Sequence, residues 1–99
     1  MSLNREEIIK IEEEHLAKVY HRRGIVVAGG KDAVIWDVNG KEYIDCMAGF
    51  GTAFVGHAHP KIVEAIKNQA EKLIACHGSL YLEVRAQLLR RLASITPKI

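Results

Sequence analysis

The spacing of apolar residues predicts three helices. In residues 4–20, isoleucine, leucine and valine recur at roughly helical intervals, and glutamates fill many of the positions between them. A second apolar stripe covers residues 60–74 and starts at Pro60, which suits a first helical turn because its missing N–H needs no partner there. A third stripe covers residues 82–95, and Pro97 closes it. We therefore predict one helix before and two helices after the middle of the chain.

Short runs rich in valine and isoleucine predict three strands between the first two helices. They occupy residues 25–28, 33–38 and 42–46. Asn39-Gly40 separates the last two runs, and both residues tolerate the positive φ of a two-residue type I′ hairpin turn. Residues 29–32, which include two glycines, connect the first two runs. The pattern predicts a three-stranded antiparallel meander.

Glycines interrupt the apolar stretch at residues 47–58, and we predict an ordered, buried, glycine-rich loop there. Its start is similar to a dinucleotide-binding fingerprint. The third glycine is missing, however, and the next helix starts only at Pro60, so the signal for nucleotide binding is weak. The predicted fold class is α+β: an N-terminal helix, a three-stranded antiparallel meander, the glycine-rich loop and two helices.

Composition narrows the function classes. A hydrophobic content of 48% indicates an ordinary globular chain. The 14 basic and 12 acidic residues are interspersed and give a net charge of +2, so no basic stripe favours nucleic acid as a partner. No apolar run is long enough to span a membrane, the first residues lack a signal peptide, and Cys46 and Cys76 form no paired motif. We expect a soluble, cytoplasmic protein.

Residue chemistry alone indicates no catalytic site. His57 and His59 have a spacing found in some metal sites, but two ligands fall short of the three or four that zinc needs. We therefore predict packed, hydrogen-bonded histidines and no metal. No Ser-His-Asp or Cys-His pairing follows from spacing. At 99 residues the chain is also too short for a two-domain cofactor enzyme, so we expect a fragment of a longer chain.

Three stretches resemble the start of class III aminotransferases. They are VIWDVNGKEYID at 34–45, AGFG at 48–51 and GHAHP at 56–60, and AIKNQ at 65–69 continues the match. The motif residues are Trp36, Asp37, Gly40, Asp45, Gly56, His57 and Pro60. The family includes acetylornithine, ornithine and 4-aminobutyrate aminotransferases, and the similarity covers residues 20–97.

The resemblance implies a fold-type I, pyridoxal-phosphate-dependent transferase. Residues 1–99 would form the amino-terminal part of its small domain, with the large cofactor-binding domain absent. The loop lies near the substrate entrance at the dimer interface in the family, so Phe50 and Gly51 are implied substrate contacts, and Tyr81 is another. Interface packing is the alternative role for each aromatic residue. His57 is expected to hold the loop through hydrogen bonds instead of acting as an acid or base.

The cofactor implied by the family is pyridoxal 5′-phosphate, and its main ligands would lie beyond Ile99. The family's Schiff-base lysine, its aspartate at the pyridine nitrogen and its phosphate-binding loop have no match in this chain. We therefore predict that no catalytic residue lies within the fragment, which should neither hold the cofactor nor transaminate alone.

Residues 20–27 and 51–56 are most similar to the archaeal branch of lysine and arginine biosynthesis. The implied reaction of the full-length homodimer is transamination between an amino acid and a 2-oxo acid or semialdehyde of the acetylornithine or acetyl-lysine type. The small substrate is free or linked to a carrier protein. Three alternatives stay open: a 4-aminobutyrate or ornithine aminotransferase, an amino-acid racemase, and a stand-alone protein-interaction module.

Overall fold

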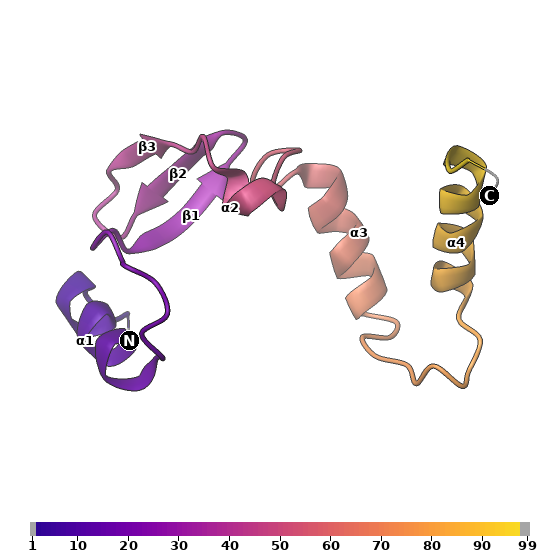
Figure 1. Ribbon diagram of the computed structural model, residues 1–99, viewed down its shortest axis with the longest axis horizontal. Coiled ribbons are helices and arrows are strands. Elements are labelled where there is room, and N and C mark those ends of the chain that lie inside the picture. Colours follow the sequence, from indigo (N-terminus) through magenta and orange to yellow (C-terminus); the bar gives the residue numbers. More distant parts are fainter. Residues whose placement is uncertain (1, 98–99) are drawn as a thin grey trace. The chain divides into compact units, whose positions relative to one another are not determined.

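The computed structural model describes residues 2–97 in two compact units, Met1–Val63 and Glu64–Ile99. Figure 1 shows the order of the elements. Before the end of the first unit these are α1 (Arg5–His15), β1 (Val27–Lys31), β2 (Val34–Asp37), β3 (Glu42–Ile44) and α2 (Ala48–Gly51). Helix α3 (Pro60–Ala70) crosses from the first unit into the second, and α4 (Glu83–Ile95) lies in the second.

Helix α1 begins where the sequence predicts but is shorter. The Asn4 side chain accepts a hydrogen bond from the Glu7 backbone N–H at 2.9 Å, and the Glu7 carboxylate accepts one from the Asn4 N–H at 2.8 Å. This capping box fixes the start. The helix ends at His15, because Leu16 has an extended backbone, so the predicted extension to residue 20 is wrong. None of its residues is buried, and helices rely mainly on packing for stability beyond their first turns.

The three strands pair in the order β1-β2-β3, and both pairings are antiparallel, which confirms the meander. The first connection is shorter than predicted, since Lys31 pairs with Val34 and leaves only Asp32 and Ala33 in the turn. Gly29 lies within β1 opposite Trp36, and a Cβ added to Gly29 would stand 2.6 Å from the indole Cζ2. This glycine makes room for an aromatic ring in the sheet and does not form a turn.

The hairpin between β2 and β3 is confirmed, but its turn is not type I′. The Gly40 N–H donates to the Asp37 carbonyl at 2.9 Å, and the Asp37 N–H donates to the Lys41 carbonyl at 3.0 Å. Gly40 has φ of +82°, whereas Asn39 is absent from the positive-φ residues of the described chain. The connection is therefore a three-residue loop with one left-handed glycine.

Helices α3 and α4 begin as predicted. Pro60 is the first residue of α3, and Leu82 precedes α4 as its N-cap. Helix α3 ends at Ala70, earlier than residue 74, because the Lys72 and Leu73 N–H groups both donate to the Gln69 carbonyl in a closing turn. The Gln69 side chain then donates to the Leu73 carbonyl at 2.9 Å and holds this end.

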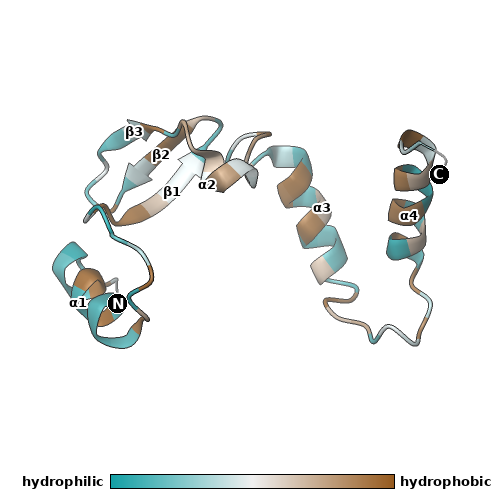
Figure 2. Cartoon of the chain, viewed as in Figure 1, coloured by the Kyte–Doolittle hydropathy of each residue, from teal (hydrophilic) through white to brown (hydrophobic). Residues whose placement is uncertain are grey.

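No residue in the described range 2–97 is buried. The loop predicted as buried is mostly exposed, and apolar residues of α3 and α4 that were expected to face inward are open, including Ile66, Leu88 and Ile95. Figure 2 shows hydrophobic residues along both helices. Natural monomers rarely leave contiguous apolar faces uncovered. The helices and strands thus form from local interactions, while the apolar faces of α3 and α4 that were expected to pack are not covered within their units.

Candidate functional site

A carboxylate–imidazole pair joins the two ends of the loop that follows β3. His57 Nε2 lies 2.6 Å from Asp45 Oδ2, and both side chains are partly buried. The His57 hydrogen bond is the main cause that lowers the pKa of Asp45, and the backbone N–H groups of Ala48 and Met47 lower it further. Asp45 is therefore an ionised acceptor at neutral pH.

The same loop is tied to the sheet through backbone bonds. The His57 N–H donates to the Asp32 carbonyl at 2.8 Å, and the Asp32 N–H donates to the His57 carbonyl at 3.1 Å. The Asp45 N–H donates to the Ala33 carbonyl at 2.8 Å. Gly56 has φ of +94°, and an added Cβ would lie 3.1 Å from the Asp32 Cα, so glycine suits this approach. Both ends of the 45–57 loop are thus fixed to the β1–β2 turn.

Helix α2, within this loop, is a left-handed turn. Its four residues have positive φ: Ala48 at 47°, Gly49 at 58°, Phe50 at 57° and Gly51 at 85°. Each non-glycine residue in this region costs about 1–2 kcal/mol. Hydrogen bonds compensate on both sides, since Asp45 Oδ1 accepts from the Met47 and Ala48 N–H groups at 2.9 and 3.0 Å. After the turn, the Ala53 N–H donates to the Ala48 carbonyl at 2.9 Å.

The backbone strain of the described chain gathers around this loop. In residues 2–97, the non-glycine residues with positive φ are Asp32, Ala48, Phe50 and Ala58. Two lie on the left-handed turn, and the other two form or adjoin the backbone bridge to His57. Strain of this kind persists only where the surroundings impose it, and it accumulates at functional sites. We therefore take the 45–57 loop as the candidate functional site.

The structure brings together only some of the predicted site residues. Asp45, Gly56 and His57 meet at the base of the loop. Phe50 lies on the left-handed turn with 89% of its surface exposed. Tyr81 belongs to the second unit, where it directly precedes the N-cap of α4 and is fully exposed. Pro60 begins α3 and takes no part in the hydrogen bonds of the loop base.

Trp36, Asp37 and Gly40 form a separate group in the β2–β3 hairpin. The Asp37 carboxylate accepts hydrogen bonds from the Lys41 N–H at 3.0 Å, the Asn39 N–H at 2.9 Å and the Tyr43 hydroxyl at 2.9 Å. The Lys41 N–H is the main cause that lowers the pKa of Asp37, and the bond to Asp37 raises the pKa of Tyr43. These contacts stabilise the turn.

Two contributors to the site were missed from the sequence. Asp32 holds His57 through backbone atoms alone, which leave no side-chain pattern to find. Thr52 closes the left-handed turn, because its hydroxyl donates to the Gly49 carbonyl at 2.9 Å. A threonine three residues after a glycine is a weak signal by itself.

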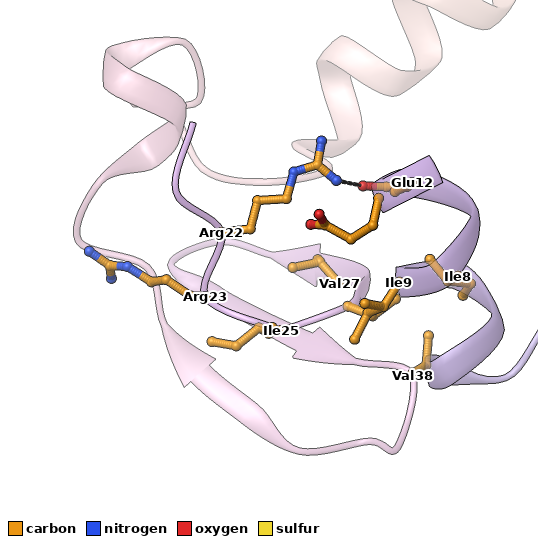
Figure 3. A pocket seen from close by; sticks show the side chains of 11 residues that line it. Ile8, Ile9, Glu12, Arg22, Arg23, Ile25, Val27 and Val38 are labelled. Carbon is orange, nitrogen blue, oxygen red and sulfur yellow. Dashed lines mark hydrogen bonds and ion pairs between the residues drawn. The ribbon is translucent and has the colours of Figure 1, made fainter. Parts of the chain in front are cut away.

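A concavity lies between α1 and the start of the sheet in the first unit. Figure 3 shows apolar side chains of α1, including Ile8 and Ile9, facing Val27 and Val38, with Arg22 paired to Glu12 at the rim. The cavity has a volume of about 770 Å³. None of the predicted site residues lines it. Its lining combines apolar side chains with Glu12, Glu13, Arg22 and Arg23, and Arg22 is paired with Glu12.

A strained loop after an antiparallel hairpin, with an aspartate and histidine at its base, agrees with the motif that suggested a transferase. The family model described as "Aminotransferase class-III" matches residues 16–98. The chain therefore belongs to the class III aminotransferases, whose cofactor is pyridoxal phosphate.

The relatives narrow this family. The chain is 40% identical over 95 residues to an acetylornithine aminotransferase of Methanothermobacter thermautotrophicus, covering 96% of this chain and 24% of that protein. It is 37% identical to a [LysW]-aminoadipate semialdehyde transaminase of Deinococcus radiodurans, covering 88% and 20%. The crystal structure of acetylornithine aminotransferase from Elizabethkingia anophelis matches with a TM-score of 0.89 and 35% identity, covering 95% and 24%. The chain thus spans about a quarter of the length of these relatives.

The described residues do not fit the attachment of pyridoxal phosphate. A lysine that forms a Schiff base needs a desolvated or cationic setting that lowers its pKa. Lysines 10, 18, 31, 41, 61, 67 and 72 are all exposed. Within residues 2–97, no three histidine, cysteine or acidic side chains gather as a metal site, and no helix is long and apolar enough to cross a membrane.

Proposed function

We propose that the full-length protein is a cytoplasmic, homodimeric aminotransferase of the acetylornithine type. It would transfer an amino group between an amino acid and a 2-oxo acid or semialdehyde with pyridoxal phosphate. Residues 1–99 would form the amino-terminal part of the small domain of a fold-type I subunit. The family match and the acetylornithine aminotransferase relatives support this proposal.

The exposed position of the Phe50 ring on the left-handed turn carries the proposal. The left-handed turn holds this aromatic ring at 89% exposure, although exposing a phenylalanine on a strained backbone brings no stability by itself. Contact with a substrate, another subunit or the rest of the full-length chain explains both features, and the strained backbone favours a functional contact. Gly51, at φ of +85° with open space where a Cβ would stand, lets a ligand approach the backbone.

The role of this segment is binding and orientation. Pyridoxal phosphate would supply the electron sink of the reaction when bound, and its attachment would lie outside the described residues. Phe50 would cover the apolar part of the substrate, with Gly51 beside it. Tyr81, fully exposed before α4, would be a further aromatic contact.

The reaction is tested by assaying the purified full-length gene product, loaded with pyridoxal phosphate, with glutamate as amino donor. We expect activity with acetylornithine-type semialdehydes. Carrier-linked aminoadipate-type semialdehydes form the second arm, because one relative is named for that reaction. Activity confined to ornithine or 4-aminobutyrate, or racemisation, would move the protein to another branch of the family. Inactivity with every acceptor would refute the proposal.

The role of Phe50 is tested by Phe50→Ala, with Phe54→Ala as the matched control. Phe54 lies in the same loop and is 79% exposed, so both substitutions remove an exposed ring. If the substrate covers the Phe50 ring on binding, losing that apolar contact should raise KM by roughly tenfold or more in Phe50→Ala, whereas Phe54→Ala should leave KM unchanged. If sedimentation instead shows a weakened dimer with unchanged KM, Phe50 packs at the interface and does not touch substrate.

A second candidate function is a stand-alone interaction module. The open apolar faces of α3 and α4 favour it, because such faces also serve as docking surfaces. It requires the 99-residue chain to fold alone, so the thermal unfolding of the isolated chain separates the two candidates.

A further inference from the structure

We propose that Asp45 and His57 are positioning residues that hold the left-handed turn at Ala48–Gly51 and thereby set the direction of Phe50. This inference rests on the proposed function, in which Phe50 contacts the substrate. It assigns the pair an effect on substrate binding through Phe50 and no contact with the reacting atoms.

The Asp45 carboxylate accepts hydrogen bonds at both ends of the loop. Its Oδ1 accepts from two successive backbone N–H groups, of Met47 and Ala48, directly before the turn. Its Oδ2 bonds His57 Nε2 at 2.6 Å. One carboxylate thus connects the entrance of the turn to the far end of the loop, and charge-assisted bonds of this kind are stronger than neutral ones.

His57 itself is fixed as well. Its backbone N–H and carbonyl both bond Asp32. Its side chain stands over Gly30, since a Cβ added to Gly30 would lie 3.1 Å from both Cβ and Cγ of His57. The histidine therefore has a rigid support in the sheet, and Asp45 in turn is held against that support.

The turn that the pair holds has a strained backbone. Ala48 and Phe50 have positive φ, which L-residues adopt only when their surroundings impose it. Without the bonds of Asp45, both residues are free to relax toward right-handed backbone. The Phe50 ring would then point elsewhere, although the sheet and the helices would remain as they are.

The decisive variants are His57→Ala and His57→Gln in the full-length holoenzyme, with His59→Ala as the control. His59 is a nearby histidine whose Nδ1 accepts from the Lys61 N–H at 3.3 Å at the start of α3. We expect His57→Ala to raise KM for the amino substrate about tenfold, as loss of a charged hydrogen bond does. Because the reacting groups are untouched, kcat per bound cofactor should stay within about twofold. The glutamine side chain can still donate to Asp45, so His57→Gln should recover part of the loss.

The Asp45 variants distinguish the bonds of its two carboxylate oxygens. Asp45→Asn keeps an oxygen that can accept from the Met47 and Ala48 N–H groups, whereas Asp45→Ala removes both oxygens. The KM should therefore rise more in Asp45→Ala than in Asp45→Asn. Equal effects would mean that the bonds to the turn contribute nothing.

A double-variant cycle tests whether His57 acts through Phe50. In the Phe50→Ala background, adding His57→Ala should raise KM by less than about twofold, because the ring that His57 positions is already gone. Additive effects would overturn the inference, since His57 would then influence substrate by another route. A fall in kcat with unchanged KM would overturn it as well and favour acid–base chemistry.

Hydrogen-exchange mass spectrometry gives a readout independent of activity. Amides of residues 46–56 should exchange faster in His57→Ala than in wild type or His59→Ala, while peptides from β2 stay unchanged. If wild type has no aminotransferase activity, the proposed function fails, yet the exchange comparison still tests the pair. If wild type is active and neither KM nor exchange changes in His57→Ala, the positioning role fails alone.

Discussion

Single residues with left-handed backbone define the candidate site. Only two of the four residues in the turn at Ala48–Gly51 are glycines, and the other two, Ala48 and Phe50, also have positive φ. Within the turn, Gly49 has no room for a side chain, since a Cβ added there would lie 2.5 Å from Thr52 Oγ1. The Thr52 hydroxyl cannot move aside without losing its hydrogen bond to the Gly49 carbonyl.

Gly49→Ala should lower the thermal stability of the full-length protein. Its positive φ costs about 1–2 kcal/mol for a residue with a Cβ, and the crowding by Thr52 adds to this. Gly78→Ala is the control, because its φ is not in the left-handed region and no heavy atom lies within 4 Å of an added Cβ. Thermal unfolding should show a lower midpoint for Gly49→Ala and no decrease for Gly78→Ala. Equal midpoints would mean that the turn is not left-handed.

The sequence predicts part of the site and not its geometry. Asp45, Gly56 and His57 follow from the family motif, and they do meet. The handedness of the turn could not be predicted, because two of its four residues, Ala48 and Phe50, are not glycine and normally avoid positive φ. Whether Phe50, Gly51 and Tyr81 contact a substrate stays a prediction.

At the scale of elements, the β2–β3 hairpin depends on an ionised carboxylate. The pKa of Asp37 is lowered in the folded state, chiefly by the Lys41 N–H. Its contribution to stability is therefore complete above the ordinary aspartate pKa of about 3.9, and it is lost as pH falls through the lowered pKa.

Asp37→Asn should reduce the acid sensitivity of this hairpin. The variant should be less stable than wild type at neutral pH, and the difference should shrink as the pH falls below about 4. Glu42→Gln removes an exposed carboxylate from the same hairpin and serves as the control. Amide exchange of the β2 and β3 peptides as a function of pH measures the effect. A difference that stays constant across this range would contradict the role of the Asp37 charge.

Helix starts were predictable, and the ends of α1 and α3 were not. Asn4 and Pro60 are local signals, because a cap or a missing N–H acts within one turn. The ends at His15 and Ala70 depend on packing and on closing bonds that apolar spacing does not record. Likewise, Gly29 indicated a turn, but its cross-strand neighbour Trp36 makes it a strand residue.

At the scale of the whole molecule, the dominant feature is apolar surface without cover. Residues such as Ile66, Leu88 and Ile95 lie open, and no residue of the described range is buried. The relatives are about four times as long as this chain, so most of their residues have no counterpart in it. The physical expectation is that the missing length supplies the cover.

The isolated 99-residue chain should therefore lack a cooperative thermal transition and should bind a hydrophobic dye. The full-length protein should unfold sharply and bind little dye at neutral pH. Differential scanning calorimetry with a parallel dye titration measures both. A sharp transition of the isolated chain would show that it folds alone and would favour the interaction module over the fragment of an enzyme.

The closed base of the 45–57 loop has a consequence for how such a protein can diverge. Because Asp32, Asp45 and His57 join both ends of the loop within one unit, the residues between them are constrained at the base and free at the exposed ring of Phe50. The bonds between Asp32, Asp45 and His57 involve neither the Phe50 ring nor the Phe54 side chain. On the proposed role of Phe50, new substrate preferences would arise in descendants of this chain by changes in a few codons, while the residues that anchor the loop are inherited unchanged.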